Sequence, residues 1–150
     1  MLLHSFWKET SWKQITNIQS YLYKLIELEE ETGNHSKAEE IAEITAQMVS
    51  LFGLWNYGKV VPYLLIAGYR KDVEKSLQLL KKILDEAQNP WNMIKSPLYY
   101  RYSDTVQGKA FSGLGNNFIR ALASEIESQK SYEYLRGNKE LDTIFEEYLK

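Results

Sequence analysis

The residues that could support chemistry are few, and they do not form a known catalytic pattern. The chain contains two histidines, His4 and His35, and no cysteine. The absence of cysteine excludes disulfides, thiolate zinc sites, iron–sulfur clusters and cysteine nucleophiles. Two histidines are too few for a histidine-rich metal site. The sequence therefore predicts neither a metal nor a cofactor.

The string QGKAFSGLGNN, residues 107–117, is the nearest approach to a nucleotide-binding motif. A phosphate loop needs Gly-x4-Gly-Lys followed by Ser or Thr, after a strand. Here Lys109 is followed by Ala110, and no strand precedes it. Ser112 also lacks the surroundings of a nucleophile elbow. We interpret these glycines as points where a neighbouring helix approaches closely.

Charged residues are abundant but nearly balanced, with 18 Lys and Arg against 20 Asp and Glu. The formal net charge of −2 excludes a polybasic nucleic-acid binder. Carboxylates gather early in the chain, and we interpret them as a solvated face rather than a cation site: Glu27, Glu29, Glu30, Glu31, Glu39, Glu40 and Glu43. Basic residues follow, too sparse for a phosphate-tracking groove: Lys59, Arg70, Lys71, Lys75, Lys81 and Lys82.

The composition is that of a globular domain. The chain has 150 residues, of which 44% are apolar and 25% charged, so it can bury a core as a single domain. The sequence contains no run of eighteen apolar residues, so no membrane span is predicted. The N-terminus lacks the pattern of a signal peptide. We therefore expect a cytoplasmic protein with no membrane partner.

Apolar residues repeat at three and four positions almost throughout, which predicts an all-α fold with about seven helices. Ser36 and Glu39 have the spacing of a capping box. Pro62 interrupts the third helix, so a helix beginning only at Val61 is the alternative there. The aromatic residues of 89–104 predict a packed connection. The helices are expected at about 10–31, between Ser36 and Gly53, at 54–68 with a kink, from Asp72 to Asn89, at 105–129, near Tyr132–Arg136, and after Asn138.

The turns of the first two helical hairpins form a repeat. Gly33 and Gly68 lie 35 residues apart, and each is followed five residues later by an apolar residue, Ala38 or Val73. This spacing resembles the tetratricopeptide repeat, in which a small residue ends one helix and an Ala opens the next. The resemblance implies stacked antiparallel hairpins in an α-α superhelix, one domain over 1–150: 1–53 as the first hairpin, 54–88 as the second, and 89–150 as a connection, a long helix and a cap.

The end of the chain carries a second resemblance. The segments SPLYY and YLRGNKELDTIFEEY are similar to the closing segments of some bacterial repeat-containing proteins. Several of those are C-terminal sensor halves of transcriptional regulators with a helix-turn-helix domain in front. The resemblance implies a regulatory domain of a larger bacterial regulator. No DNA-reading segment is visible in this chain itself.

A concave face lined by the first helices of the hairpins is the candidate binding site. Asn amides both donate and accept, so they can hold an extended peptide backbone, and Tyr and Trp add contact area. The alternative is that the aromatic residues pack in the core and the Asn residues cap helices. The candidates are Asn17, Ser20, Lys24, Trp55, Asn56, Lys59, Tyr63, Asn116, Asn117 and Arg120.

Three hypotheses follow. The first is a non-enzymatic module that binds a peptide or protein partner. The second is a structural homodimer formed through the aromatic N-terminus, with Phe6, Trp7 and Trp12 at the interface, and through the aromatic cluster of 89–104. Docking of the N-terminal segment on the first repeat is the alternative. The third is a small enzyme that uses Glu and Tyr side chains of a pocket within 99–117.

Overall fold

The computed structural model describes residues 2–89, 91, 95–100 and 115–150, with side chains from residue 13 onward, and this part contains helices and no strand. Its helices are α1 (Leu2–Glu31), α2 (His35–Leu51), the 3-10 helix η1 (Asn56–Lys59), α3 (Val61–Tyr69), α4 (Val73–Gln88), α6 (Gly115–Ser128), the 3-10 helix η4 (Lys130–Leu135) and α7 (Lys139–Tyr148). The expected all-α fold with about seven helices is confirmed. None of the described helices is long and apolar enough to cross a membrane.

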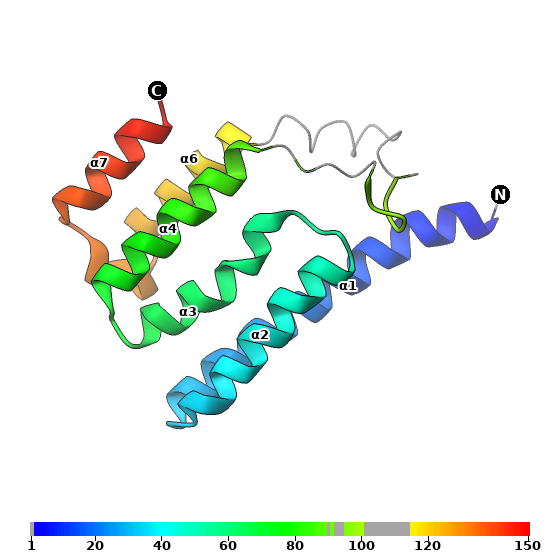
Figure 1. Ribbon diagram of the computed structural model, residues 1–150, viewed down its shortest axis with the longest axis horizontal. Coiled ribbons are helices and arrows are strands. Elements are labelled where there is room, and N and C mark those ends of the chain that lie inside the picture. The colour runs from blue at the N-terminus through cyan, green and yellow to red at the C-terminus, as the bar shows by residue number, and fades with distance from the viewer. Residues whose placement is uncertain (1, 90, 92–94, 101–114) are drawn as a thin grey trace.

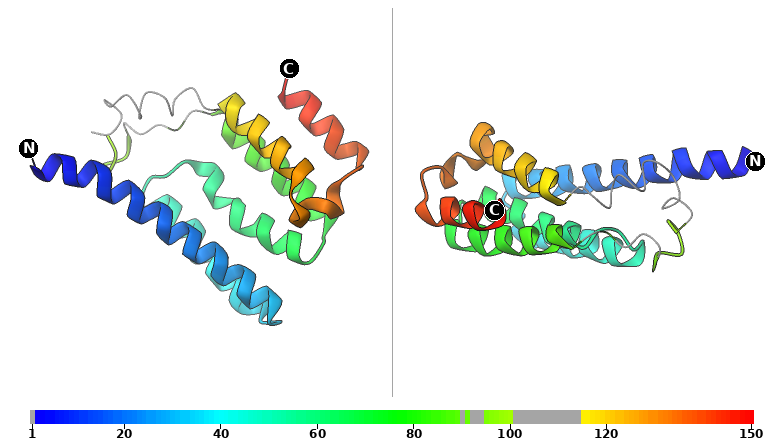
Figure 2. Two further views of the ribbon diagram at one scale, coloured as in Figure 1. Left: turned by 180° about the vertical axis from the view of Figure 1, so that it is seen from behind. Right: turned by 90° about the horizontal axis from the view of Figure 1, so that it is seen from above.

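The helices pair as antiparallel hairpins. α1 packs along α2, and α3 packs along α4 (Figure 1). α3 lies at the centre, because it contacts α1, α2 and α4. α6 and α7 both pack on α4, and the edge-on view of Figure 2 shows α1 and α6 in one layer and α4 and α7 in the other. The tetratricopeptide-like superhelical twist stays a prediction.

The main core surrounds α4, whose broad apolar face packs against α3, α6 and α7. Its most buried side chains come from four helices and η4: Leu64, Leu77, Leu80, Ile83, Leu84, Ile119, Ile126, Leu135 and Ile144. A smaller cluster joins the first hairpin to α3 through Ile26, Ala38, Ala42 and Ile66. The small Ala residues let α1 and α2 approach closely, as in any tight helical hairpin.

Two expected helices begin elsewhere than predicted. α1 extends to Leu2 rather than starting near residue 10, because the segment contains no Gly or Pro to end it. The kinked helix over 54–68 is wrong, and the alternative start at Val61 is confirmed. Pro62 is the second residue of α3. Amides in the first turn of a helix have no acceptor within that helix, so the lack of an amide donor at Pro62 costs no hydrogen bond. Residues before it form the separate helix η1.

Side-chain caps begin α4 and α7 but not α2. Asp72 accepts a hydrogen bond from the amide of Lys75 at 3.0 Å and caps α4. Asn138 caps α7 in the same way, through the amides of Glu140 and Leu141. The capping box at Ser36 is wrong, because α2 begins one residue earlier and Asn34 precedes it without a side-chain hydrogen bond.

The two hairpin turns share a backbone design, but not at the residues that the repeat paired. Gly33 has a φ of +80° before α2, and Lys71 has a φ of +52° before α4. Gly68 lies within α3 instead. The equivalent turn positions are therefore Gly33 and Lys71, and the pairing of Gly33 with Gly68 is wrong. Their separation in the sequence is 38 residues rather than 35.

The described part of 89–104 is a packed connection, as expected. Trp91 and Tyr99 are buried, with ring centroids 5.8 Å apart. The Trp91 indole donates to the carbonyl of Gly53 at 2.9 Å, and the Ser96 hydroxyl donates to that of Phe52 at 3.3 Å. The connection therefore covers the end of α2. The remainder of the segment lies outside the described residues.

The expected close approach of helices at a glycine is confirmed for Gly115. A Cβ atom there would lie 2.7 Å from the backbone carbonyl oxygen of Ala87. Only glycine lets α6 approach α4 this closely. The predicted helix over 105–129 is described as α6 from residue 115, and residues 105–114 lie outside the described part.

A matched pair of glycine substitutions tests the corrected turn assignment. We expect Gly33→Ala to destabilise the protein by about 1–2 kcal/mol, since an L-residue is strained at positive φ; nothing lies within 4 Å of a Cβ there, so crowding adds no cost. We expect Gly68→Ala to stabilise by up to about 1 kcal/mol as a helix-interior substitution. Its Cβ would meet the Tyr134 hydroxyl at an ordinary 3.4 Å.

Urea unfolding of the two variants beside the wild type measures both effects. Equal destabilisation by the two substitutions would contradict the assignment.

Candidate functional site

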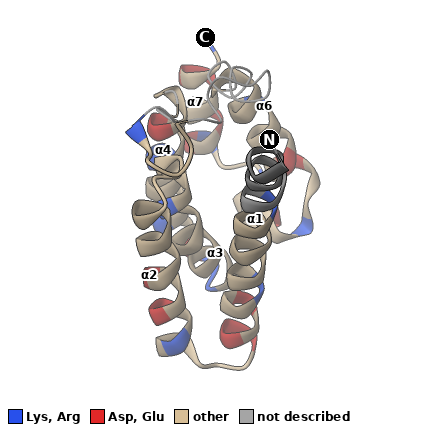
Figure 3. Cartoon of the chain, turned by 90° about the vertical axis from the view of Figure 1, so that its right-hand side faces the viewer, with Lys and Arg blue, Asp and Glu red and all other residues tan. Residues whose placement is uncertain are grey.

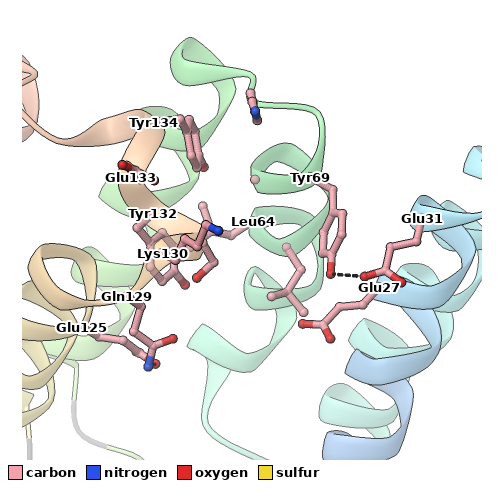
Figure 4. A pocket seen from close by; sticks show the side chains of 14 residues that line it. Glu27, Glu31, Leu64, Tyr69, Glu125, Gln129, Lys130, Tyr132, Glu133 and Tyr134 are labelled. Atoms are coloured by element: carbon pink, nitrogen blue, oxygen red, sulfur yellow. Dashed lines mark hydrogen bonds between the residues drawn. The ribbon is translucent and has the colours of Figure 1, made fainter.

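A groove of about 920 Å³ crosses the first helices of the hairpins. Figure 4 shows α1 carboxylates on one side and side chains of α6 and η4 on the other, with α3 between them. The α3 residues that line it are Leu64, Leu65, Gly68 and Tyr69, with Lys71 in the turn that follows. The walls are Glu27 and Glu31 of α1, Glu125 of α6, and Gln129, Lys130, Ser131, Tyr132, Glu133 and Tyr134.

Acidic groups dominate the charge of the groove. Four carboxylates line it against the ammonium groups of Lys71 and Lys130. Within the described residues none of these four carboxylates forms an ion pair. Several acidic residues, with a basic one among them, lie near the turn between α1 and α2 (Figure 3). The groove therefore has a negative rim.

Two tyrosines of the groove lie beside these carboxylates. Tyr69 donates to Glu31 at 3.2 Å (Figure 4). Burial, with the nearby charges of Glu27 and Glu31, raises the pKa of Tyr69 to about 12. Burial, with the charge of Glu125, likewise raises the pKa of Tyr132 to about 12. Both phenols therefore stay protonated and uncharged at neutral pH.

Three of the predicted binding residues continue the α1 wall. Asn17, Ser20 and Lys24 are exposed, and they precede Glu27 and Glu31 at spacings of three and four residues. Residues at those spacings lie along one stripe of a helix. The structure thus places them on the groove side of α1, although they lie beyond the groove itself.

The predicted residues around η1 lie elsewhere. The Trp55 indole donates to the backbone carbonyls of Glu86 at 3.2 Å and Asn89 at 3.0 Å, so it anchors the end of α4. Asn56 lines a separate hollow of about 370 Å³ next to that contact. Lys59 is half-buried and lines neither the groove nor this hollow. These positions do not form one face with Asn17.

Tyr63 faces away from the groove, into a third hollow of about 460 Å³. Its hydroxyl donates to Glu43 of α2 at 2.6 Å. Burial and this carboxylate raise the pKa of Tyr63 to about 12, and the same hydrogen bond lowers the pKa of Glu43. Tyr63 therefore joins α3 to α2, as the packing alternative expected.

The α6 candidates are exposed but do not line the groove. A helix turns about 100° per residue, so Asn116 and Arg120 lie about 180° and 140° around α6 from the groove residue Glu125. Asn117 lies closer to that side, about 80° away. The sequence predicted the helix but not the side of it that lines the groove.

Two further candidate regions cannot be placed. Phe6, Trp7 and Trp12 belong to the first half of α1, but their side chains lie outside the described residues. Most of 99–117, the region of the enzymatic hypothesis, also lies outside them. In the part of the chain that is described, no three His, Asp or Glu side chains come together as metal ligands.

A buried carboxylate, which the sequence did not reveal, ties the two hairpins together. The Glu30 side chain is only 2% exposed. It accepts hydrogen bonds from the Arg70 guanidinium at 2.8 and 3.4 Å, and it contacts Nδ1 of His35 at 2.8 Å. Arg70 also binds Glu39 at 2.9 Å. Glu30 is thus no part of a solvated face, and no sequence pattern distinguished it from its acidic neighbours.

Comparison with protein-family models, curated proteins and solved structures gives no match. The candidate site therefore depends on the geometry and charge of the groove.

Removing the partner of Glu30 should destabilise the fold strongly. Burial raises its pKa, but hydrogen bonds from Arg70 and His35 outweigh that effect and hold the pKa below its ordinary value. Because the folded-state pKa is lowered, this stabilisation is complete above pH 4.5, the ordinary value, and is lost as the pH falls below it. We expect Arg70→Met to cost about 2 kcal/mol at pH 7, because the buried charge of Glu30 then keeps only its contact with His35.

Denaturant unfolding at a series of pH values checks both effects. Between pH 5 and pH 3 the free energy of unfolding of Glu30→Gln should fall less than that of the wild type, because Gln does not take up the proton that Glu30 does. Glu40→Gln, which removes an exposed ion pair with Lys37, is the control and should change stability by less than about 0.5 kcal/mol. An unchanged pH profile in Glu30→Gln would contradict the assignment.

Proposed function

We propose that the protein is a non-enzymatic helical-repeat module that binds a peptide segment of a partner protein in the groove of α1, α3 and α6. The observation that carries the proposal is the groove itself, which has a volume of about 920 Å³. Its floor is the apolar side of α3, and its polar walls come from α1, α6 and η4. Such a surface can bury the side chains of a bound segment while its rim fixes orientation. A role as the regulatory part of a bacterial transcriptional regulator, and a cytoplasmic location, stay predictions.

Selection of random linear peptides displayed on phage against the immobilised protein tests this function. The chain contains no cysteine, so a single introduced cysteine carries a photo-crosslinker at a unique position. We expect selected peptides to crosslink to Ser131→Cys, which lines the groove, and not to Ser50→Cys, which lines the 370 Å³ hollow. No enriched peptide, or crosslinking at residue 50 alone, would overturn the proposed groove.

A second candidate function, self-association, is favoured by an apolar outer face of the first hairpin. On α1, Ile18, Tyr21 and Leu28 are 45%, 62% and 51% exposed; on α2, Ile44 and Leu51 are 55% and 79% exposed. The half-buried Leu25, Ile41 and Met48 complete two rows of four with spacings of three, four and three residues. Such rows are the pattern by which helices pair side by side.

A second copy of this chain fits the outer face because its eight residues are uncharged. Two-fold symmetry places the same patch on both partners, so a charged patch would repel its copy and an uncharged one does not. Two rows on neighbouring helices can pack on their symmetry mates as a four-helix bundle.

Light scattering over a concentration series tests the second candidate. We expect the wild type to form a dimer and Ile44→Gln/Leu51→Gln to shift it towards the monomer. Because both side chains are more than half exposed, the double variant should keep the monomer's stability within about 1 kcal/mol. A wild type that stays monomeric at high concentration would exclude this function.

A further inference from the structure

We infer that the groove selects a cationic peptide segment, one whose Lys or Arg side chains flank an apolar or aromatic residue. The inference rests on the proposed peptide-binding function and adds the chemistry of the partner. Its basis is the distribution of charge and aromatic groups around the groove, with Glu27 and Glu31 on one wall and Glu125 and Glu133 on the other.

The carboxylates on both walls are available to a ligand. Glu27, Glu31, Glu125 and Glu133 form no ion pair within the described residues. Glu31 accepts the neutral hydroxyl of Tyr69, and Glu125 accepts the neutral amide of Gln129 at 3.2 Å. By contrast, the buried Glu30 on the same helix uses its oxygens on Arg70 and His35. The groove carboxylates thus keep their capacity to bind ammonium or guanidinium groups.

The cations that could neutralise this rim are few or already engaged. Lys71 and Lys130 are the two basic residues that line the groove, against four carboxylates, and Lys24 lies one turn before Glu27, just beyond the groove. Arg70 binds Glu30 and Glu39 on the other side of α3. Arg136 donates to the backbone carbonyls of Ile126 and Gln129. An acidic peptide would therefore meet net repulsion, and a basic one net attraction.

The floor of the groove specifies the rest of the ligand. Leu64 and Leu65 supply an apolar surface, and Tyr69 and Tyr132 present aromatic rings from the two sides (Figure 4). An aromatic ring beside carboxylates favours a Lys or Arg side chain, because the ring attracts the cation and contacts its apolar stem. A segment of cationic residues around one apolar residue matches both features.

The composition of selected peptides tests the inference separately from the proposed function. The wild type and Glu27→Gln/Glu31→Gln are each screened with the same random phage library. We expect peptides enriched on the wild type to be rich in Lys and Arg, and this bias to weaken on the variant. Gln still accepts a hydrogen bond, so the contact with Tyr69 is retained while the charge is lost.

Fluorescence anisotropy with one enriched peptide then gives the magnitude. Exposed ion pairs are individually weak, so the loss of two carboxylates should lower affinity roughly three- to tenfold. Raising NaCl from about 0.05 M to about 0.5 M should weaken wild-type binding, because salt screens exposed charges. Glu146→Gln/Glu147→Gln, which removes two exposed charges of α7 outside the groove, is the matched control and should leave affinity unchanged.

The possible failures are distinct. Enriched peptides that crosslink in the groove but are neutral or acidic would overturn the cationic preference and leave peptide binding intact. Equal loss of affinity in the α7 control would show a general effect of net charge and would also overturn the inference. A screen without any enriched peptide would overturn the proposed function together with the inference.

Discussion

The relative position of the two hairpins depends on one buried carboxylate. Glu30, in the last turn of α1, binds Arg70 at the end of α3 and His35 at the start of α2. A buried charge without its partner costs several kcal/mol, so an arrangement that brings both partners to Glu30 is favoured over one that does not. The neighbouring apolar contacts of Ile26 and Ile66 add burial but little direction, because the hydrophobic effect is not directional. The ionic contact therefore supplies the registration between α1 and α3.

This registration also builds the groove. Arg70 pairs with Glu30, and the adjacent Tyr69 pairs with the adjacent Glu31. Consecutive helical residues point about 100° apart, so directing Glu30 inward directs Glu31 to the groove wall. Glu27, one turn earlier, lies on the same wall. The contact between Arg70 and Glu30 holds the hairpins together, and the contact between Tyr69 and Glu31 shapes the surface that we propose for binding.

Local features of the fold could be predicted from the sequence, whereas contacts between distant segments could not. The caps Asp72 and Asn138 and the turn at Gly33 were predictable because each depends on a few adjacent residues. Lys71 was missed as the second turn residue because lysine has no preference for positive φ, so the nearby Gly68 attracted the assignment. Glu30 was missed because its partner Arg70 lies 40 residues away.

The candidate site shows the same limit. Asn17, Ser20 and Lys24 share one stripe of α1 with Glu27 and Glu31, and helical spacing alone is enough to predict such a stripe. Trp55 and Tyr63 lie away from the groove. An aromatic side chain with a polar end suits both a binding surface and a packed interior, so the sequence does not distinguish the two. Only the fold shows that their polar atoms bind Asn89 and Glu43.

The two proposed functions use adjacent stripes of the same helix. The groove lies beside Glu27 and Glu31, while the outer face contains Tyr21 and Leu28. Pairing of two copies through the outer face involves only α1 and α2, so it would leave the α3 floor and the α6 wall of both grooves uncovered. A partner with two cationic segments could then bind both grooves, and the second contact would form at high effective concentration. The weak attraction expected of each exposed ion pair would in that case suffice for selective binding.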